Sequence, residues 1–327
     1  MKKAGPLFLI ALASLAVFIF SMMIGPADIA PLKALTALFG DGRNAIIVRD
    51  IRLPRALAAW LAGAALGASG AALQGLLRNP LADPGVLGVS ASAALGAVIA
   101  IYFNLAAAAF WVTPILAIFF ALLATAALYA FGAGALSPAR LILVGVGLSS
   151  FAGALIALVM NLAPNPFVLS DLVNWLFGAV TNRNFNDLAL TAPFIGAGLL
   201  LALVAAPGLT ALTLGEEAAS TIGADISKTR MLAIAGAALM TGGSVALAGA
   251  IGFVGIVAPH LARPFVNHDP GRAIIPSAFI GGAILALADL LIRLAPFDQE
   301  LKLGVAAALI GAPGFVFIAA RTQRIAR

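Results

Sequence analysis

The sequence predicts an all-α protein that crosses a membrane about ten times. Of its 327 residues, 62% are hydrophobic and only 10% are charged, whereas an ordinary soluble domain is about 45–50% apolar and about 25% charged. Such a chain cannot cover its own core with polar surface in water, so a lipid bilayer is the solvent that fits it. Within lipid each span must satisfy its own backbone hydrogen bonds, which favours helices.

Apolar runs separated by short polar or Gly/Pro breaks define the expected spans of one transmembrane domain, residues 1–327. The first run follows Lys2 and Lys3 and is long enough to be an uncleaved span, with a secretory signal as the alternative. The eighth run is too short to cross the bilayer alone. Small residues, as in 63–70, let neighbouring helices approach closely. The expected spans are 6–26, 56–77, 86–104, 108–131, 140–161, 191–213, 231–250, 251–261, 273–294 and 303–320.

Basic residues predict the orientation of these spans. The chain has 19 Lys and Arg against 13 Asp and Glu, a net charge of +6, and basic cytoplasmic loops facing anionic lipid explain this excess without nucleic acid. With the N-terminus inside, eleven basic residues fall on the inner side and eight on the outer side. Five of those eight crowd the outer loop at about 28–55 and need an explanation of their own: Lys33, Arg43, Arg49, Arg52 and Arg55.

Several kinds of chemistry have no residues to support them. The chain has no Cys and two His, too few for the usual transition-metal site. No Gly-Lys pair occurs, so a phosphate-binding loop is absent and active transport would need an ATPase on another chain. No acidic residue falls near the middle of an expected span, which counts against ion coupling through buried carboxylates. Asp289 comes nearest, and an ion pair with Arg293 one turn away explains it.

The inner loop at about 215–230 is the best candidate for contact with such an ATPase. Glu216 and Glu217 are expected to begin a short helix, where acidic residues favour the positive N-terminal end. Gly223 is well placed to end it. A rigid helix between two spans suits the transmission of force, whereas a solvated connector is the simpler alternative.

Four blocks of sequence, in this order, make the chain resemble the FecCD-type iron-chelate and cobalamin uptake permeases. Each block alone is weak in a protein rich in Gly and Ala, but the four together are specific. Lys302 departs from the pattern, because the family usually has Pro there. The blocks are 51–88, with IRLPR, Gln74 and RNPLADPGVLG; 217–223, with EAA and Gly; 248–263, with AGAIGFVGIVAPHLAR; and 288–315, with Ala-Asp, Arg293, Gly304 and GAPGF.

The resemblance implies a type II ABC importer permease with two related helical halves in a bacterial inner membrane. Two copies would pair with two ATP-binding subunits and one periplasmic binding protein, and would pass an iron complex (siderophore or haem) inward by alternating access. Cobalamin is the alternative cargo. ATP and Mg²⁺ would be bound by the partner ATPase, and this chain is expected to hold no cofactor or metal and to catalyse no reaction.

The resemblance also assigns roles to particular residues. Arg52, Arg55 and Arg293 match arginines that receive acidic residues of the binding protein, with a lipid-headgroup anchor as the alternative. The coupling contact with the ATPase falls on Glu216, Glu217, Ala218, Ala219 and Gly223. The region of the cytoplasmic gate matches Asn79, Leu81, Pro138 and Ala139, where simple turns explain the sequence equally well. His260, beside a break in the eighth span, is expected to be structural.

Two rival classes of function stay open at this point. An ion-coupled secondary transporter would work without a partner, using sites built from backbone carbonyls. A membrane scaffold that transports nothing would leave the charged inner loop and the outer arginines without coupled roles.

Overall fold

The computed structural model describes residues 4–27, 29–132, 138–296 and 300–313, and within them every regular element is a helix. Seven helices are long and apolar enough to cross a membrane, and three shorter apolar helices accompany them. Together they account for the roughly ten spans expected. The long helices are α1 (Ala4–Met23), α4 (Leu53–Leu77), α6 (Val112–Gly132), α7 (Pro138–Asn161), α9 (Phe185–Ala211), α11 (Ile226–Ala248) and α13 (Pro270–Leu294); the shorter ones are α5 (Val89–Tyr102), α12 (Val254–Ala262) and the helix in 303–313.

Most helix boundaries lie within a few residues of the expected ones, but α9 begins six residues before the expected position. Asn184 caps the helix, since its Oδ1 accepts hydrogen bonds from the backbone N–H groups of Asn186 (2.8 Å) and Asp187 (3.2 Å). The Asp187 carboxylate accepts in turn from the Asn184 N–H (3.0 Å). This capping box extends the helix through polar residues that the apolar pattern excluded. The last expected span, 303–320, is described only as far as residue 313.

Two outer segments hold helices that the apolar pattern did not predict. The basic segment at about 28–55 consists largely of α2 (Pro31–Ala37), α3 (Arg43–Ile46) and the π-helical turn η1 (Ile47–Arg52), which continues directly into α4. After α7, the short helix α8 (Pro166–Leu176) begins at Asn165, whose side chain accepts from the Val168 N–H at 3.0 Å. The first segment is too charged and α8 is too short to be predicted as a membrane span. Pro166, in the first turn of α8, is nevertheless a sequence signal for the start of a helix.

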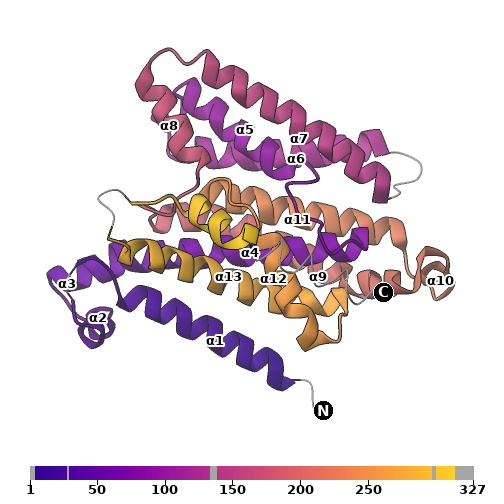
Figure 1. Ribbon diagram of the computed structural model, residues 1–327, viewed down its shortest axis with the longest axis horizontal. Coiled ribbons are helices and arrows are strands. Elements are labelled where there is room, and N and C mark those ends of the chain that lie inside the picture. The colour runs from indigo at the N-terminus through magenta and orange to yellow at the C-terminus, as the bar shows by residue number, and fades with distance from the viewer. Residues whose placement is uncertain (1–3, 28, 133–137, 297–299, 314–327) are drawn as a thin grey trace.

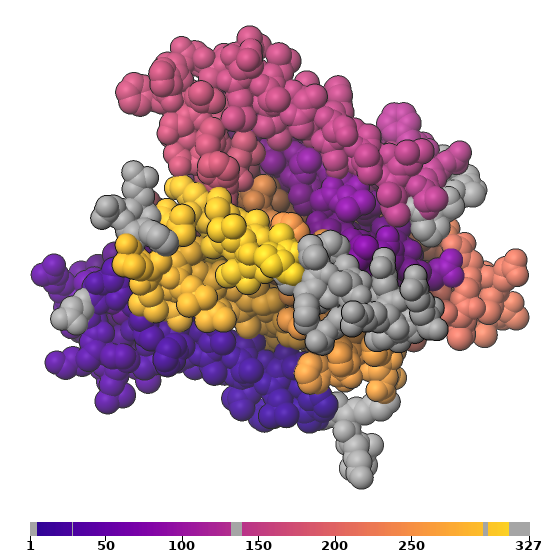
Figure 2. All heavy atoms as spheres, viewed as in Figure 1, coloured from indigo at the N-terminus to yellow at the C-terminus, as the bar shows by residue number. Residues whose placement is uncertain are grey.

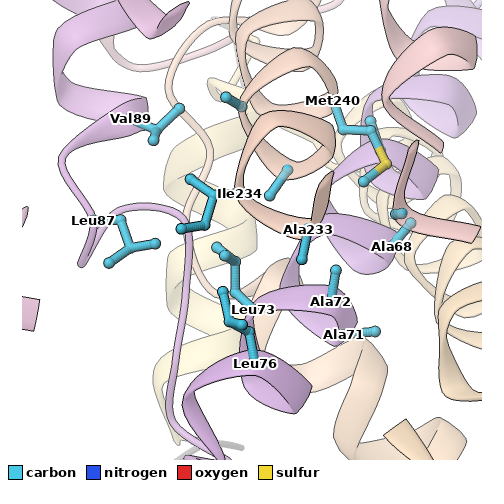
Figure 3. Packing of buried hydrophobic residues seen from close by; sticks show 14 of the residues in the cluster. Ala68, Ala71, Ala72, Leu73, Leu76, Leu87, Val89, Ala233, Ile234 and Met240 are labelled. Atoms are coloured by element: carbon cyan, nitrogen blue, oxygen red, sulfur yellow. The ribbon is translucent and has the colours of Figure 1, made fainter. Parts of the chain in front are cut away.

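The core of the bundle surrounds α4, which is buried along most of its length and packs against α13, α11, α12 and α9. Figure 3 shows one part of this core, where alanines and leucines of α4 meet Ala233, Ile234 and Met240 of α11. Because most of these side chains are small, the helices lie close together. Close packing replaces the hydrophobic effect as the main source of attraction between helices in lipid.

Glycines mark the closest of these contacts. A Cβ atom added to Gly63 or Gly67 of α4 would clash with the backbone of Gly281 or Ser277 on α13, and one added to Gly70 would clash with Gly255 of α12. The run 63–70 therefore forms the tight helix contact that its composition predicted.

The two ends of the bundle carry different elements. In Figure 1, α2, α3 and α8 lie at one end, whereas the start of α1 and the short helix α10 (Glu216–Thr221) lie toward the opposite end. Figure 2 shows the face between them, where residues 300–313 lie over the bundle with α1 along one side and α5 to α7 along the other. The predicted orientation makes the first end the outer one and the α10 end the cytoplasmic one.

Candidate functional site

The three arginines predicted to face a binding protein lie together at the outer end of α1. Arg52, the last residue of η1, is only 4% exposed. Its two Nη atoms donate hydrogen bonds to the carbonyl oxygens of Met23 (2.8 Å) and Ala27 (2.7 Å). These carbonyls belong to the end of α1 and the turn that follows, where the helix itself provides no donors. Arg52 thus caps α1.

Arg293 caps the same helix from α13. Its Nη1 donates to the Ile24 carbonyl (2.8 Å), and its Nη2 donates to the Ser21 carbonyl (2.9 Å) and hydroxyl (2.7 Å). Its Nε lies 3.0 Å from a carboxylate oxygen of Asp289, one turn earlier, and the Arg293 side chain is 3% exposed. The ion pair predicted from the i, i+4 spacing is therefore present.

Asp289 also pairs with Arg55, a contact that the sequence analysis did not predict. The Arg55 Nη2 and Nε atoms lie 2.8 Å and 3.0 Å from Asp289 Oδ1, and the same guanidinium contacts the carboxylate of Glu300. Asp289 is 1% exposed and Arg55 is 13% exposed. A buried carboxylate held between two guanidinium groups joins α4 to α13, and removal of one partner from such a cluster is strongly destabilising.

This outer charge cluster (Arg52, Arg55, Arg293, Asp289 and Glu300) differs from an open basic patch. Its three cations and two anions leave one net positive charge, and Arg55 is the arginine that reaches an exposed side chain, Glu300. A docking role for these arginines stays a prediction. The other basic residues of the outer segment are exposed: Lys33, Arg43 and Arg49.

At the inner end, the expected coupling helix is present as α10. Glu216 and Glu217 occupy its first turn, and the Glu216 carboxylate pairs with Arg230 of α11 at 2.5 Å. Ala219 is completely buried, whereas Glu217 and Ala218 are exposed. The helix is thus fixed on one side and open on the other.

Gly223 ends this helix as predicted. Its φ is +87°, and the backbone N–H groups of Gly223 and Ala224 donate to the carbonyls of Ser220 (2.9 Å) and Ala219 (3.0 Å). This pair of bonds is the Schellman arrangement, which needs the left-handed conformation that glycine adopts without strain.

Two apolar side chains beside α10 were missed because they lie outside the charged motif. Leu214 and Ile222 flank the helix and are 64% and 65% exposed. Large apolar side chains exposed at the cytoplasmic end, together with exposed Glu217, form the surface we call the α10 face (Leu214, Glu217, Ala218, Thr221 and Ile222). Such a mixture of apolar and charged groups is typical of a protein interface.

The predicted gate residues occupy two separate turns of the chain. Asn79 follows α4, and its side chain accepts a hydrogen bond from the Leu81 N–H at 2.9 Å, so it makes the turn that its sequence favours. Leu81 is 42% exposed. Pro138 and Ala139 begin α7, and Ala139 is exposed. These positions are compatible with a gate and with simple turns.

Residues 85–88, which follow the turn at Asn79, pack against α7, and the helix predicted to begin at residue 86 begins at Val89. The Ser149 hydroxyl, three turns into α7, donates to the Gly85 carbonyl at 2.8 Å, and a Cβ at Gly145 would contact Leu87. Gly88, with a φ of +78°, precedes α5. The apolar pattern could not predict this contact with α7, because residues 86–88 are apolar or small like the span that follows them.

His260 lies in the last turn of α12, and its Nδ1 is buried without a hydrogen-bond partner. No cluster of three or more metal-ligating side chains occurs within the described residues.

Comparison with known proteins places the chain among membrane transport subunits. The sequence pattern of the FecCD transport family matches residues 12–321. The iron(3+)-hydroxamate import system permease FhuG of Bacillus subtilis is 34% identical, over 97% of this chain and 98% of that protein. The vitamin B12 import system permease BtuC of Klebsiella pneumoniae is 36% identical, over 97% and 94% of the two chains. A solved chain described as an inward-facing metal-chelate type ABC transporter has a TM-score of 0.85 at 28% identity, covering 96% of this chain and 98% of that one.

Proposed function

Because the chain belongs to the FecCD transport family, we propose that it is the permease subunit of an ATP-driven importer that moves an iron complex into the cytoplasm by alternating access. It is a polytopic inner-membrane protein. The observation that supports the proposal best is a helical bundle of the permease fold whose cytoplasmic end presents a short, fixed helix, α10. A siderophore or haem is the proposed cargo. Cobalamin is the second candidate, which the similarity to BtuC favours.

The α10 face is the proposed contact with a separate ATP-binding subunit. Its anchors to the bundle are the buried Ala219 and the Glu216–Arg230 ion pair. A push on the exposed side of α10 would therefore reach α11, which packs on α4 and α9. This chain has no phosphate-binding loop of its own, so force from ATP hydrolysis must enter through such a contact.

The outer end is the proposed contact with a binding protein. We assign the first electrostatic encounter to exposed Arg43 and Arg49, with Arg55 receiving a carboxylate in place of Glu300. Arg52 and Arg293 would hold the end of α1 in position beneath this surface. Complementary charge would set the rate and register of docking.

A second copy of the chain is the proposed partner within the membrane. The helix α7 packs on α5 and α6 and leaves Leu143, Phe151 and Leu158 exposed. A twofold pair of chains would give one α10 face to each of two ATP-binding subunits, with the pathway between the copies. If the chain acts alone, lipid covers this exposed face of α7 instead of a second copy.

Reconstitution tests the whole proposal. We expect uptake of a ferric chelate into proteoliposomes only when this chain, its ATP-binding subunit, its binding protein and ATP are all present. A ligand-binding screen on the binding protein would then distinguish siderophore, haem and cobalamin. Uptake that follows a proton or sodium gradient without ATP would instead identify a secondary transporter.

A further inference from the structure

A cavity of about 730 Å³ opens at the outer end of the bundle, and no residue of the outer charge cluster lines it. Its lining comes from the ends of α5 and α11, from α8 and from the connection between α8 and α9. Figure 1 shows α8 and its neighbouring connections at this end of the bundle. Its volume falls within the range of small-molecule sites, about 300–1,000 Å³. The side chains that define its chemistry are those of Tyr102, Asp171, Asn174, Trp175 and Arg183.

Arg183 is the unusual group in this cavity. Its Nε is buried without a hydrogen-bond partner, and no carboxylate of a described residue lies within ion-pair distance of its guanidinium. Burial lowers the pKa of Arg183, and the more distant charge of Asp187 acts in the opposite direction. Arginine nonetheless stays protonated at neutral pH, because its ordinary pKa lies far above 7. Its Nε donor is thus left unsatisfied, which is costly in a buried position, and an anionic ligand would remove that cost.

The backbone around Arg183 holds it in place. Asn182 has a left-handed φ of +62°, and Asn184 is fixed by the capping box of α9. The Asp187 carboxylate takes part in that box through the Asn184 N–H, so it is engaged with the backbone. On the other side, the Ala179 N–H donates to the Ala248 carbonyl at 2.8 Å, which ties the connection to the end of α11. The site is thus built before a ligand arrives.

The rest of the wall indicates what kind of ligand fits. The rings of Trp175 and Tyr102 provide apolar surface, and the Tyr102 hydroxyl is already engaged with the Leu162 carbonyl at 3.0 Å. The Asn174 amide N–H₂ donates to Ser170 Oγ at 3.2 Å, which leaves its carbonyl oxygen as an acceptor. Asp171 adds a second acceptor. The cavity therefore suits a compact molecule with an anionic group for Arg183 and hydroxyl or similar donors for Asp171 and Asn174.

We propose that this cavity is a receiving site for a carboxylate-bearing iron chelate, whose carboxylate pairs with Arg183 as the chelate enters the permease. The assignment rests on the proposed import function and adds the chemical class of cargo. The alternative ligand is an acidic side chain of a partner protein. Such a side chain would pair with Arg183 but would offer no donor to the acceptors Asp171 and Asn174 in the same cavity. A small polyfunctional chelate satisfies all of these groups at once.

The test measures binding to the isolated chain in lipid nanodiscs, with quenching of tryptophan fluorescence as the signal. The probes are ferric citrate, which carries carboxylates and a hydroxyl, and a neutral ferric trihydroxamate. We expect Arg183→Gln to weaken ferric citrate binding about 10- to 100-fold, the usual effect of losing a charged hydrogen-bonding pair. Arg183→Lys should lose less, because it keeps the charge, and Lys33→Gln on the outer surface is the matched control. Trp175→Phe should reduce the quenching signal.

Several outcomes would overturn the assignment. One is wild-type chain that does not bind ferric citrate, and another is equal loss in Arg183→Gln and Lys33→Gln. A third is an Arg183→Gln variant that binds the binding protein more weakly but binds ferric citrate as the wild type does. That result would show that Arg183 binds a side chain of the binding protein and not the chelate. If the reconstituted importer takes up ferric citrate with unchanged KM and rate in Arg183→Gln, the receiving site is rejected and the import function stands. If the wild-type assembly takes up no chelate, the import function itself fails.

Discussion

The two ends of the bundle use their charged residues in opposite ways. At the outer end, Arg52 and Arg293 are almost fully buried and bind carbonyl groups of α1 and its following turn, while Asp289 joins Arg55 to Arg293. At the inner end, α10 is fixed by the ion pair of Glu216 with Arg230 and by the buried Ala219, and its neighbours Glu217 and Ile222 face outward. The outer cluster thus stabilises the bundle itself, whereas the α10 face is left available to a partner.

This difference shows that a sequence motif does not by itself tell whether a charge is exposed. The arginines of the outer motif resemble contact residues of the family, yet they have most of their donors satisfied within the chain. Substitutions there should act first on folding, and substitutions at the inner end should act on coupling.

The largest effect is expected for Asp289→Ala. The substitution leaves Arg55 with only Glu300 and deprives the buried Arg293 of its carboxylate. Breaking a buried pair in this way costs about 3–5 kcal/mol. Size-exclusion chromatography after heating in detergent should show a marked loss of thermal stability. Asp50→Ala, at an exposed carboxylate of the same outer end, should leave stability unchanged; equal stability of both variants would contradict the buried cluster.

A second large effect is expected for Gly223→Val at the inner end. A β-branched residue at a φ of +87° costs about 1–3 kcal/mol and should displace the end of α10. We expect ATP-driven uptake to fall strongly while the chain remains folded, because the bundle does not depend on this turn. Gly196→Val on α9, where an added Cβ meets nothing, is the control. Normal uptake by Gly223→Val would show that the shape of α10 is unimportant for coupling.

A smaller effect is expected when the apolar part of the α10 face is removed. Leu214→Ser together with Ile222→Ser should weaken binding of the ATP-binding subunit about 30-fold, since each side chain buries apolar surface worth about 1 kcal/mol. Pull-down titrations in detergent measure this affinity. Ser227→Ala, exposed in the same inner segment, should have no effect. An unchanged affinity in the double variant would place the ATPase contact elsewhere.

The smallest effect is expected for the exposed outer cations. Arg43→Gln with Arg49→Gln should slow association of the binding protein a few-fold and reduce its dependence on salt, while dissociation changes little. Surface plasmon resonance at two ionic strengths measures both rates. If docking depends only on the outer charge cluster, this double variant will bind like the wild type.

Local sequence signals predicted the long spans and α10, because apolar length and helix ends are properties of neighbouring residues. Gly223 ending α10 and the Asp289–Arg293 pair both act within four residues. The cap at Asn184 is equally local, but the apolar pattern did not predict it. The partners of Arg52 and Arg55 could not be predicted, since they lie 25 to 245 positions away in the chain. The outer cavity was missed for the same reason, because it forms where three separate segments of the chain meet: 101–106, 164–183 and 248–249.

Uptake in proteoliposomes tests the central claim, that the chain transports only when force enters through α10, most directly. Vesicles with the complete assembly and ATP should accumulate a ferric chelate, and the same vesicles with Gly223→Val should not. Accumulation against a gradient by the purified chain alone, without nucleotide, would contradict the account.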